Sequence, residues 1–337
     1  MKRILKILPL VMVASLSACQ QYYDDSIFCF DTVVTIRLKG YQGYSGQKTI
    51  GETLKIIKGI DAISDAYKKR DVVSVYDLNQ TNERIEISRD LYDLLYYSKQ
   101  MNDWVAPYFN PLIGSLSNKW KEALIKGEVL SDEVIQEELE KMNSSKIDIE
   151  EIDEHYYAKR YGDALIDLGG IAKGFALDKC DQYLMYHGDG DDDYIINAGS
   201  SSILLGRNYQ NKKAKAGYEN TYKVKIKDLS KPTYLYLKKC TVSTSGISEQ
   251  GVKIGDTVYS HIINPVTGSA VNNYDAVIVI RDSYGSNDGY LGDALSTSFM
   301  NSTIEEIQEA EMYYNVQTIV IKDDKIVYQN ESIELFY

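Results

Sequence analysis

Strand-like and helix-like segments alternate between residues 164 and 205, and this order restricts the fold more than any other feature of the chain. Residues 164–168 read as a strand that runs into two glycines, and residues 171–186 read as a helix. Two short strands are expected after it, at 194–198 and 202–205. Segments in this order form a sheet with helices packed on it, so they predict an α/β or α+β body.

The flanking segments extend this pattern. A β-branched run at 30–38 is typical of a strand, and residues 53–69, 90–101 and 130–142 carry apolar side chains at helical spacing. Towards the C-terminus we expect strands at 221–227, 233–238 and 275–281, helices at 290–300 and 303–312, and a hairpin of 318–321 with 326–328.

The N-terminus has the pattern of a lipoprotein signal. Lys2 and Arg3 precede an apolar run, and Leu16-Ser17-Ala18-Cys19 places small residues before a cysteine. A transmembrane anchor is the alternative, but a spanning helix needs about 20 apolar residues, and this run is shorter and interrupted. We therefore expect a signal peptide at 1–18, lipid on Cys19, a tether at 19–29 and one domain at 30–337, anchored on the extracytoplasmic face of the cell membrane.

Charge and cysteine content exclude two other classes of function. The chain has 37 Lys plus Arg against 49 Asp plus Glu, a net charge of −12, so no basic face for nucleic acid is expected. After Cys19 only Cys29, Cys180 and Cys240 remain, without metal-type spacing, so at most one disulfide can form. The acidic tract at 188–193 lacks the closing glutamate of a calcium loop and is expected to be a solvated turn.

A glycine pair stands between the expected strand and helix, in the run Asp167-Leu168-Gly169-Gly170-Ile171-Ala172-Lys173-Gly174. Glycine allows close approach of the backbone to a ligand, and free amides at a helix N-terminus attract phosphate. Lys173 would reach an anionic group from the first turn. The run matches neither of the two commonest nucleotide fingerprints, so a simple turn before a helix is the alternative.

Two further segments are rich in small polar residues. Residues 197–202 read Asn-Ala-Gly-Ser-Ser-Ser, and residues 241–246 read Thr-Val-Ser-Thr-Ser-Gly. Their hydroxyls leave room for a ligand and supply hydrogen-bond donors. Ordinary polar turns are the alternative.

A histidine and an acidic helix face complete the candidate residues. His261 lies within residues 259–268, and only two other histidines occur, so a histidine metal cluster is not expected. Asp293 and Thr297 are four residues apart, so on a helix their oxygens would share one face. Such a face suits Mg²⁺, which binds few protein ligands together with water or phosphate oxygens.

Taken together and in this order, the segments resemble the ApbE family of FAD:protein FMN transferases. Its members read Asp-Leu-Gly-Gly-Ile-Ala-Lys-Gly, Asn-x-Gly-Gly, Ser-Thr-Ser-Gly, His-Ile-Ile-Asp-Pro-x-Thr-Gly and Asp-Ala-x-Ser-Thr. The likeness spans residues 30–335, with looser matches at 74–79 and 108–111. It implies an α+β fold related to the T-fold, with mixed sheets and packed helices in a single compact catalytic body.

The resemblance also implies roles for particular residues. FAD would contact Phe30, Tyr108, Phe109, Asn110, Asp167, Lys173, Ser243, Thr244, Ser245, His261 and Ile263. Mg²⁺ would be held by Asp293 and Thr297, with the Gly170 carbonyl and Ser296. His261 and Asp293 would be the catalytic residues, His261 by accepting a hydroxyl proton, although a role in holding a backbone or adenine group is the alternative.

Four positions depart from the family pattern. Asn264 stands for the usual Asp before Pro265, Asn110 stands for another Asp, and Ser200 and Ser201 stand for paired glycines. Asparagine keeps the size but loses the charge, so we expect altered metal or adenine affinity, and serine would narrow the pocket.

In the reaction that the resemblance implies, FAD is cut at its pyrophosphate, FMN joins a Thr or Ser hydroxyl of a secreted or membrane flavoprotein, and AMP leaves. Such a reaction needs mainly positioning and charge neutralisation. A Mg²⁺-dependent FAD pyrophosphatase that releases FMN and AMP is one alternative. A lipoprotein that binds flavin without catalysis is another.

Overall fold

The computed structural model describes residues 22–39, 44–104, 108–187, 193–199, 201–206, 217–247, 251–282 and 289–337, which form eight helices and fifteen strands. The expected signal peptide, Cys19, Ser200 and residues 188–192 of the acidic tract lie outside the described residues. Within those ranges, no helix is both long enough and apolar enough to cross a membrane.

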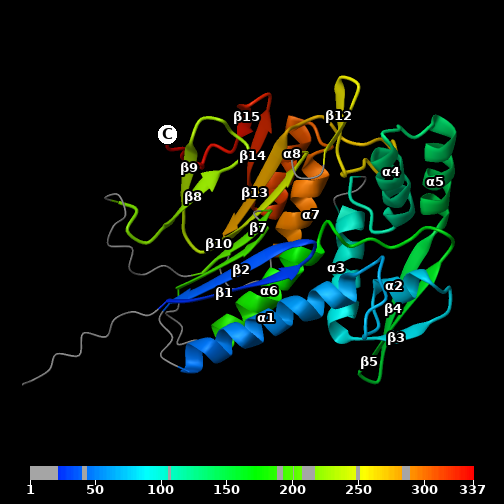
Figure 1. Cartoon of the computed structure of the whole chain (residues 1–337), viewed down its shortest axis with the longest axis horizontal. Helices are drawn as coiled ribbons and strands as arrows, with labels where there is room; N and C mark the ends of the chain where they lie inside the picture. Colours follow the sequence, from blue (N-terminus) through cyan, green and yellow to red (C-terminus); the bar gives the residue numbers. More distant parts are fainter. Residues whose placement is uncertain are drawn as a thin grey trace, which may run out of the picture.

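An eight-stranded antiparallel sheet forms the centre of the fold, in the order β1-β2-β6-β7-β10-β13-β14-β15 (Figure 1). Its strands are β1 (Tyr22–Cys29), β2 (Thr32–Lys39), β6 (Asp193–Ala198), β7 (Ser202–Leu205), β10 (Cys240–Gly246), β13 (Ala276–Asp282), β14 (Gln317–Lys322) and β15 (Lys325–Gln329). β10, β13 and β14 are almost entirely buried, so they form the middle of the core.

Three smaller sheets lie around this centre. They are a three-stranded sheet in the order β3-β5-β4 and the hairpins β8–β9 and β11–β12. Their strands are β3 (Ile85–Ile87), β4 (Lys146–Ile152), β5 (His155–Tyr161), β8 (Tyr222–Ile226), β9 (Thr233–Leu237), β11 (Val252–Ile254) and β12 (Thr257–Tyr259). The β8–β9 hairpin packs with the outer face of β10 and β13 in one apolar cluster.

The helices are α1 (Tyr44–Ser64), α2 (Val75–Asn79), α3 (Arg89–Trp104), α4 (Gly114–Lys126), α5 (Asp132–Ser144), α6 (Ala172–His187), α7 (Gly289–Phe299) and α8 (Ile304–Tyr314). α1, α6 and α7 cover one face of the large sheet, whereas α2 to α5 lie with the β3-β5-β4 sheet at one end (Figure 1). α8 begins at a capping box in which Thr303 and Glu306 bond each other's backbone amides, a local signal that fixes its start. The α+β class is confirmed.

Three expectations differ from the structure. The expected tether at 19–29 is β1 from Tyr22 onward, hidden in the sequence because Asp24, Asp25 and Ser26 lie exposed at the sheet edge and break the apolar alternation. The polar segment at 241–246, for which no strand was expected and a turn was the alternative, is strand β10. Residues 164–168 join no sheet, and Asn79 satisfies the backbone of Ile166 in place of a neighbouring strand. Its side-chain amide donates to the carbonyl at 2.9 Å, and its side-chain oxygen accepts from the N–H at 2.8 Å.

Candidate active site

A cavity of about 350 Å³ opens where the β1–β2 turn, the end of α1, the glycine turn and α7 meet. Fourteen of the residues predicted for the site line it: Phe30, Tyr108, Phe109, Asn110, Asp167, Gly170, Lys173, Thr244, Ser245, His261, Ile263, Asp293, Ser296 and Thr297. Ser243 is buried behind the wall and bonds the Asp293 carboxylate, so it supports the site from beneath. The segments predicted separately are therefore one site.

The glycine turn lies directly against α7. A Cβ added to Gly170 would lie 3.4 Å from Thr297 Oγ1 and 3.3 Å from the Phe109 ring, so a larger residue would crowd both. Asp167 closes the turn by accepting a 2.8 Å hydrogen bond from the Gly169 amide. The Gly169 amide is therefore bonded within the turn, as are the Ile171 and Ala172 amides, which donate to the Leu168 carbonyl.

Asp293 is the buried acid of the site, with 6% of its surface exposed. Its carboxylate accepts hydrogen bonds from the Gly174 amide at 2.5 Å and the Ser202 hydroxyl at 2.7 Å. Burial raises the pKa of the carboxyl, and the Lys173 charge and the hydrogen bonds oppose that rise without cancelling it. A divalent cation at the carboxylate would reverse the effect and favour the charged form.

Hydroxyl groups extend the oxygen-rich surface beside Asp293. The Ser245 hydroxyl lies 2.9 Å from that of Ser296 and 3.2 Å from that of Thr297. In the described part of the chain, no three His, Cys, Asp or Glu side chains cluster as a metal cage. One carboxylate with neighbouring hydroxyls and the Gly170 carbonyl fits Mg²⁺, a hard cation that keeps several water or phosphate ligands.

A basic side chain completes this part of the wall. Lys173, in the first turn of α6, donates a 2.6 Å hydrogen bond to the Ser201 hydroxyl. Ser201, one of the serines that replace the family's glycines, is buried and lines the cavity. The substitution thus positions the lysine, an effect that the sequence did not indicate.

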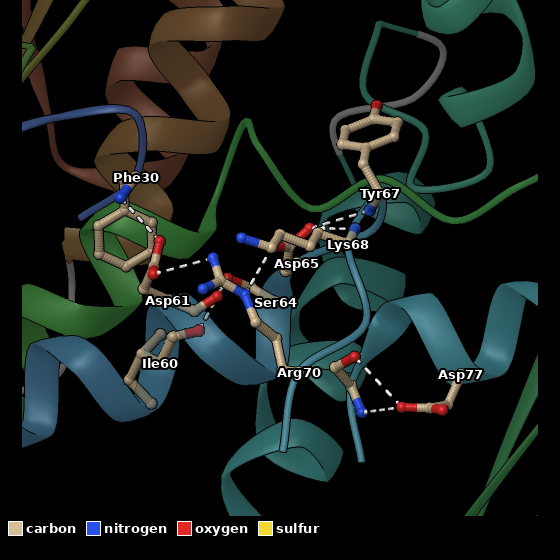
Figure 2. Close-up of polar contacts among 10 residues, drawn as sticks. Phe30, Ile60, Asp61, Ser64, Asp65, Tyr67, Lys68, Arg70 and Asp77 are labelled. Atoms are coloured by element: carbon tan, nitrogen blue, oxygen red, sulfur yellow. Dashed lines mark hydrogen bonds and ion pairs between the residues drawn. The ribbon is translucent and has the colours of Figure 1, made fainter. Parts of the chain in front are cut away.

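The opposite wall was missed by sequence reasoning and comes from the end of α1 (Figure 2). Asp61 accepts the Phe30 amide at 2.7 Å and lies 3.4 Å from the Arg70 guanidinium. Arg70 also donates to Asp65 at 2.7 Å. A signal existed: an acid in the last turn of a helix opposes the helix dipole, so Asp61 indicates a nearby cation.

Tyr67 connects this wall to the glycine turn. The Asp65 carboxylate accepts the Tyr67 and Lys68 amides, each at 2.9 Å, and thereby fixes the turn that carries the tyrosine (Figure 2). The Tyr67 hydroxyl in turn donates to Asp167. Burial and the Asp167 charge raise the pKa of Tyr67 far above its usual range, so the hydroxyl stays protonated and remains a donor.

Two asparagines that depart from the family pattern have structural roles. The Asn264 side-chain oxygen accepts the Val266 amide at 2.8 Å and the Thr267 amide at 3.0 Å. The Asn110 oxygen accepts the Leu112 amide at 2.9 Å. An amide oxygen serves these turns as well as a carboxylate, which explains why the fold tolerates both changes.

Comparisons with known proteins agree with this geometry. The model of the ApbE family matches residues 30–319. A protein of Treponema pallidum named FAD:protein FMN transferase is 24% identical over 226 residues, which are 64% of this chain and 62% of that relative, under two thirds of its length. A Chlamydia muridarum protein of the same name is 22% identical over 269 residues, 79% of this chain and 78% of its own.

Solved structures show the same fold. The ApbE protein of Thermotoga maritima superposes with a TM-score of 0.76 at 23% identity, and the flavin transferase ApbE of Vibrio cholerae with 0.72 at 20%. Each comparison covers 93% of this chain and 98% of the other. Because the family model covers well over half of the 337 residues, the chain belongs to the ApbE family.

Proposed function

We propose that the protein transfers FMN from FAD to a Ser or Thr hydroxyl of an extracytoplasmic flavoprotein and releases AMP, in a reaction that depends on Mg²⁺. One observation carries the proposal: the glycine turn at Gly169 and Gly170 and the oxygen face of Asp293 and Thr297 line the same cavity. A diphosphate needs this combination of backbone amides, a cation and a metal face. The names of the curated relatives support the same reaction.

The transfer is balanced without a further reactant. The acceptor oxygen forms a bond to the phosphorus on the FMN side of FAD, the bond from that phosphorus to the AMP phosphate oxygen breaks, and the hydroxyl proton passes to a base. His261, exposed on the cavity wall, is the residue to which we assign that proton.

The chain's own residues bind and orient the diphosphate. Lys173 and the backbone of Gly170 line the cavity, where they would balance the negative charge of the diphosphate. Asp293 and Thr297 would hold Mg²⁺, with Ser296 and the Gly170 carbonyl, and the bound ion would neutralise the diphosphate charge. The Phe30 ring and the Tyr108–Phe109 pair supply aromatic surface for the flavin and adenine rings.

We also propose that Cys19 carries the lipid that anchors the protein outside the cytoplasm. The first described strand, β1, begins at Tyr22, three positions after this cysteine in the sequence, so the sheet would stand near the membrane. Wild-type protein expressed in a bacterium with labelled palmitate is expected to carry the label, and Cys19→Ser is expected to lose it. Label retained by Cys19→Ser would overturn the assignment.

The function is tested by mixing the purified chain with FAD, Mg²⁺ and a secreted flavoprotein from the same genome. Flavin fluorescence on the acceptor band of a denaturing gel, with an equal amount of AMP released, supports transfer. AMP with only free FMN would show hydrolysis instead, and no AMP would leave a binding protein.

A further inference from the structure

We propose that the free edge of strand β1 binds the acceptor protein as an added extended strand and leads its hydroxyl into the cavity. The inference rests on the proposed transferase function and concerns how that reaction selects its protein substrate. β1 is the first strand of the eight-stranded sheet, and the turn that follows it, Phe30 and Asp31, lines the cavity. A strand paired with β1 would therefore run directly to the reacting groups.

The edge of β1 carries backbone groups that are not bonded to β2. Cys29 lies opposite Thr32 across a two-residue loop, so alternate residues of β1, including Phe28 and Ser26, direct their amides and carbonyls away from β2. The Ser26 amide faces this edge and donates to the Asp25 side chain at 2.7 Å, a local bond that an added strand would replace. Asp24, Asp25 and Ser26 are exposed one after another, although successive side chains of a strand point to opposite faces of the sheet. In the described structure, therefore, neither face of the sheet is covered at this edge.

An apolar pair marks the end of the edge nearest the cavity. Phe28 and Val33 lie opposite each other in the β1–β2 register, and they are 69% and 54% exposed. At the far end the same face carries an ion pair, Arg37 with Asp24 at 2.5 Å. Tyr22 is also exposed at that far end, but its ring lies beside the cationic groups of Arg37 and Lys39. The uncharged Phe28–Val33 pair beside the cavity fits an apolar side chain next to the acceptor hydroxyl.

The turn after β1 is held rigidly. Phe30 and Asp31 have φ of 54° and 55°, the left-handed region that a type I′ turn requires and that Asn-Gly usually occupies. The Phe30 amide is fixed by Asp61 of α1, which also lies by Arg70 (Figure 2). A strand added to β1 would thus have a constant register relative to the cavity.

Charge favours the acceptor over two other occupants. A second copy of this chain paired antiparallel along β1 would bring Asp24 and Asp25 of both copies close together, and like charges on paired strands repel. The same acids disfavour direct contact between this edge and anionic lipid headgroups, also in a protein anchored through Cys19. A segment of the acceptor protein with few acidic residues would not be repelled. Its backbone hydrogen bonds to β1 would give affinity without requiring a particular side-chain sequence.

The test compares Ser26→Pro with Ser26→Ala, using the acceptor labelled in the transfer assay. Proline removes the amide that faces the edge and places a ring there, and it leaves the bonds to β2 intact. We expect Ser26→Pro to raise the KM for the acceptor at least tenfold. The Kd for FAD and the slow hydrolysis of FAD to FMN and AMP without acceptor are expected to stay unchanged. Ser26→Ala, which keeps the amide, is expected to match wild type.

A second variant guards against misfolding of the proline protein. Phe28→Ser combined with Val33→Thr keeps all backbone groups, and we expect it to raise the acceptor KM at least threefold with FAD binding unchanged. An acceptor KM equal to wild type in this double variant would overturn the inference. The inference would also be overturned if the wild-type protein formed a dimer, or bound lipid vesicles, and the double variant did not. Absence of transfer by wild type would instead contradict the proposed function itself.

Discussion

The Asp293 carboxylate on α7 accepts a 2.5 Å hydrogen bond from the backbone amide of Gly174 on α6. The two helices are in close contact here, because a Cβ on Gly174 would lie 2.0 Å from the Gly289 carbonyl oxygen. This packing places the acid directly below the glycine turn, and Ser202 holds its second oxygen. The metal face and the phosphate-binding turn are therefore one structural unit.

Gly174→Ala is expected to push α6 and α7 apart. The added methyl would collide with the backbone at Gly289, which cannot move aside as a flexible side chain would. We expect a loss of at least about 3 kcal/mol in the free energy of unfolding, measured by urea denaturation, together with loss of activity. Gly59→Ala is the matched control: nothing lies near its added Cβ within α1, so a gain of about 0.5–1 kcal/mol is expected. Equal effects of the two substitutions would contradict this account of the α6–α7 contact.

Asn79→Ala is expected to loosen the segment that carries Asp167. The Asn79 side chain satisfies both backbone groups of the buried Ile166, and alanine would leave both without a partner. Each buried unsatisfied group costs about 1–3 kcal/mol, so we expect a stability loss of about 2–4 kcal/mol and a raised KM for FAD. Gln80→Ala, at the next residue and exposed, should change neither value. Unchanged FAD binding in a folded Asn79→Ala protein would show that Asp167 does not depend on this brace.

Asp65→Asn is expected to change how stability depends on pH. Burial raises the pKa of the Asp65 carboxyl, but hydrogen bonds from the Tyr67 and Lys68 amides and from Arg70 outweigh it, so the pKa lies below the usual 3.8. A carboxyl whose pKa is lower in the folded state than in the unfolded state stabilises the fold at pH values above its unfolded-state pKa. That contribution is lost as the pH falls through its folded-state pKa.

We therefore expect Asp65→Asn to be less stable than wild type by about 1–3 kcal/mol at pH 7. The difference should shrink as the pH falls below about 4. Urea denaturation at a series of pH values measures it, with Asp71→Asn, an exposed acid of the same loop, as the control that differs little at any pH. A difference that stays constant down to low pH would mean that the carboxylate charge contributes nothing.

Much of the fold follows from local sequence pattern. The helices expected at 90–101, 130–142 and 171–186 are confirmed, and α5 begins after Ser131 as its sequence indicates. The helix expected at 53–69 is instead α1, which begins earlier, at Tyr44, and ends at Ser64. β10 could not be predicted, because its small hydroxyl residues face α7 inside the core, where Ser243 approaches Gly292. Its burial depends on a neighbour far away in sequence.

The candidate site likewise has a part that the sequence predicts and a part that it does not. Residues within motifs gather in one cavity, because the topology brings β10, α7, the start of α6 and the segment after β12 together. The wall of Asp61, Asp65, Tyr67 and Arg70 carries no motif, and its function as a unit depends on contacts with Phe30 and Asp167 that only the folded chain reveals. Sequence periodicity cannot encode such long-range polar pairs.

The most direct test of the central claim uses Mn²⁺ in place of Mg²⁺ and records the ³¹P signals of FAD bound to the protein. If Asp293 and Thr297 hold a cation against the diphosphate, Mn²⁺ should broaden both phosphorus signals strongly with wild type. Asp293→Asn, which keeps the side-chain size and can still accept the Gly174 amide, should bind FAD without this broadening. Equal broadening in wild type and Asp293→Asn would contradict the claim that this face of α7 binds the metal.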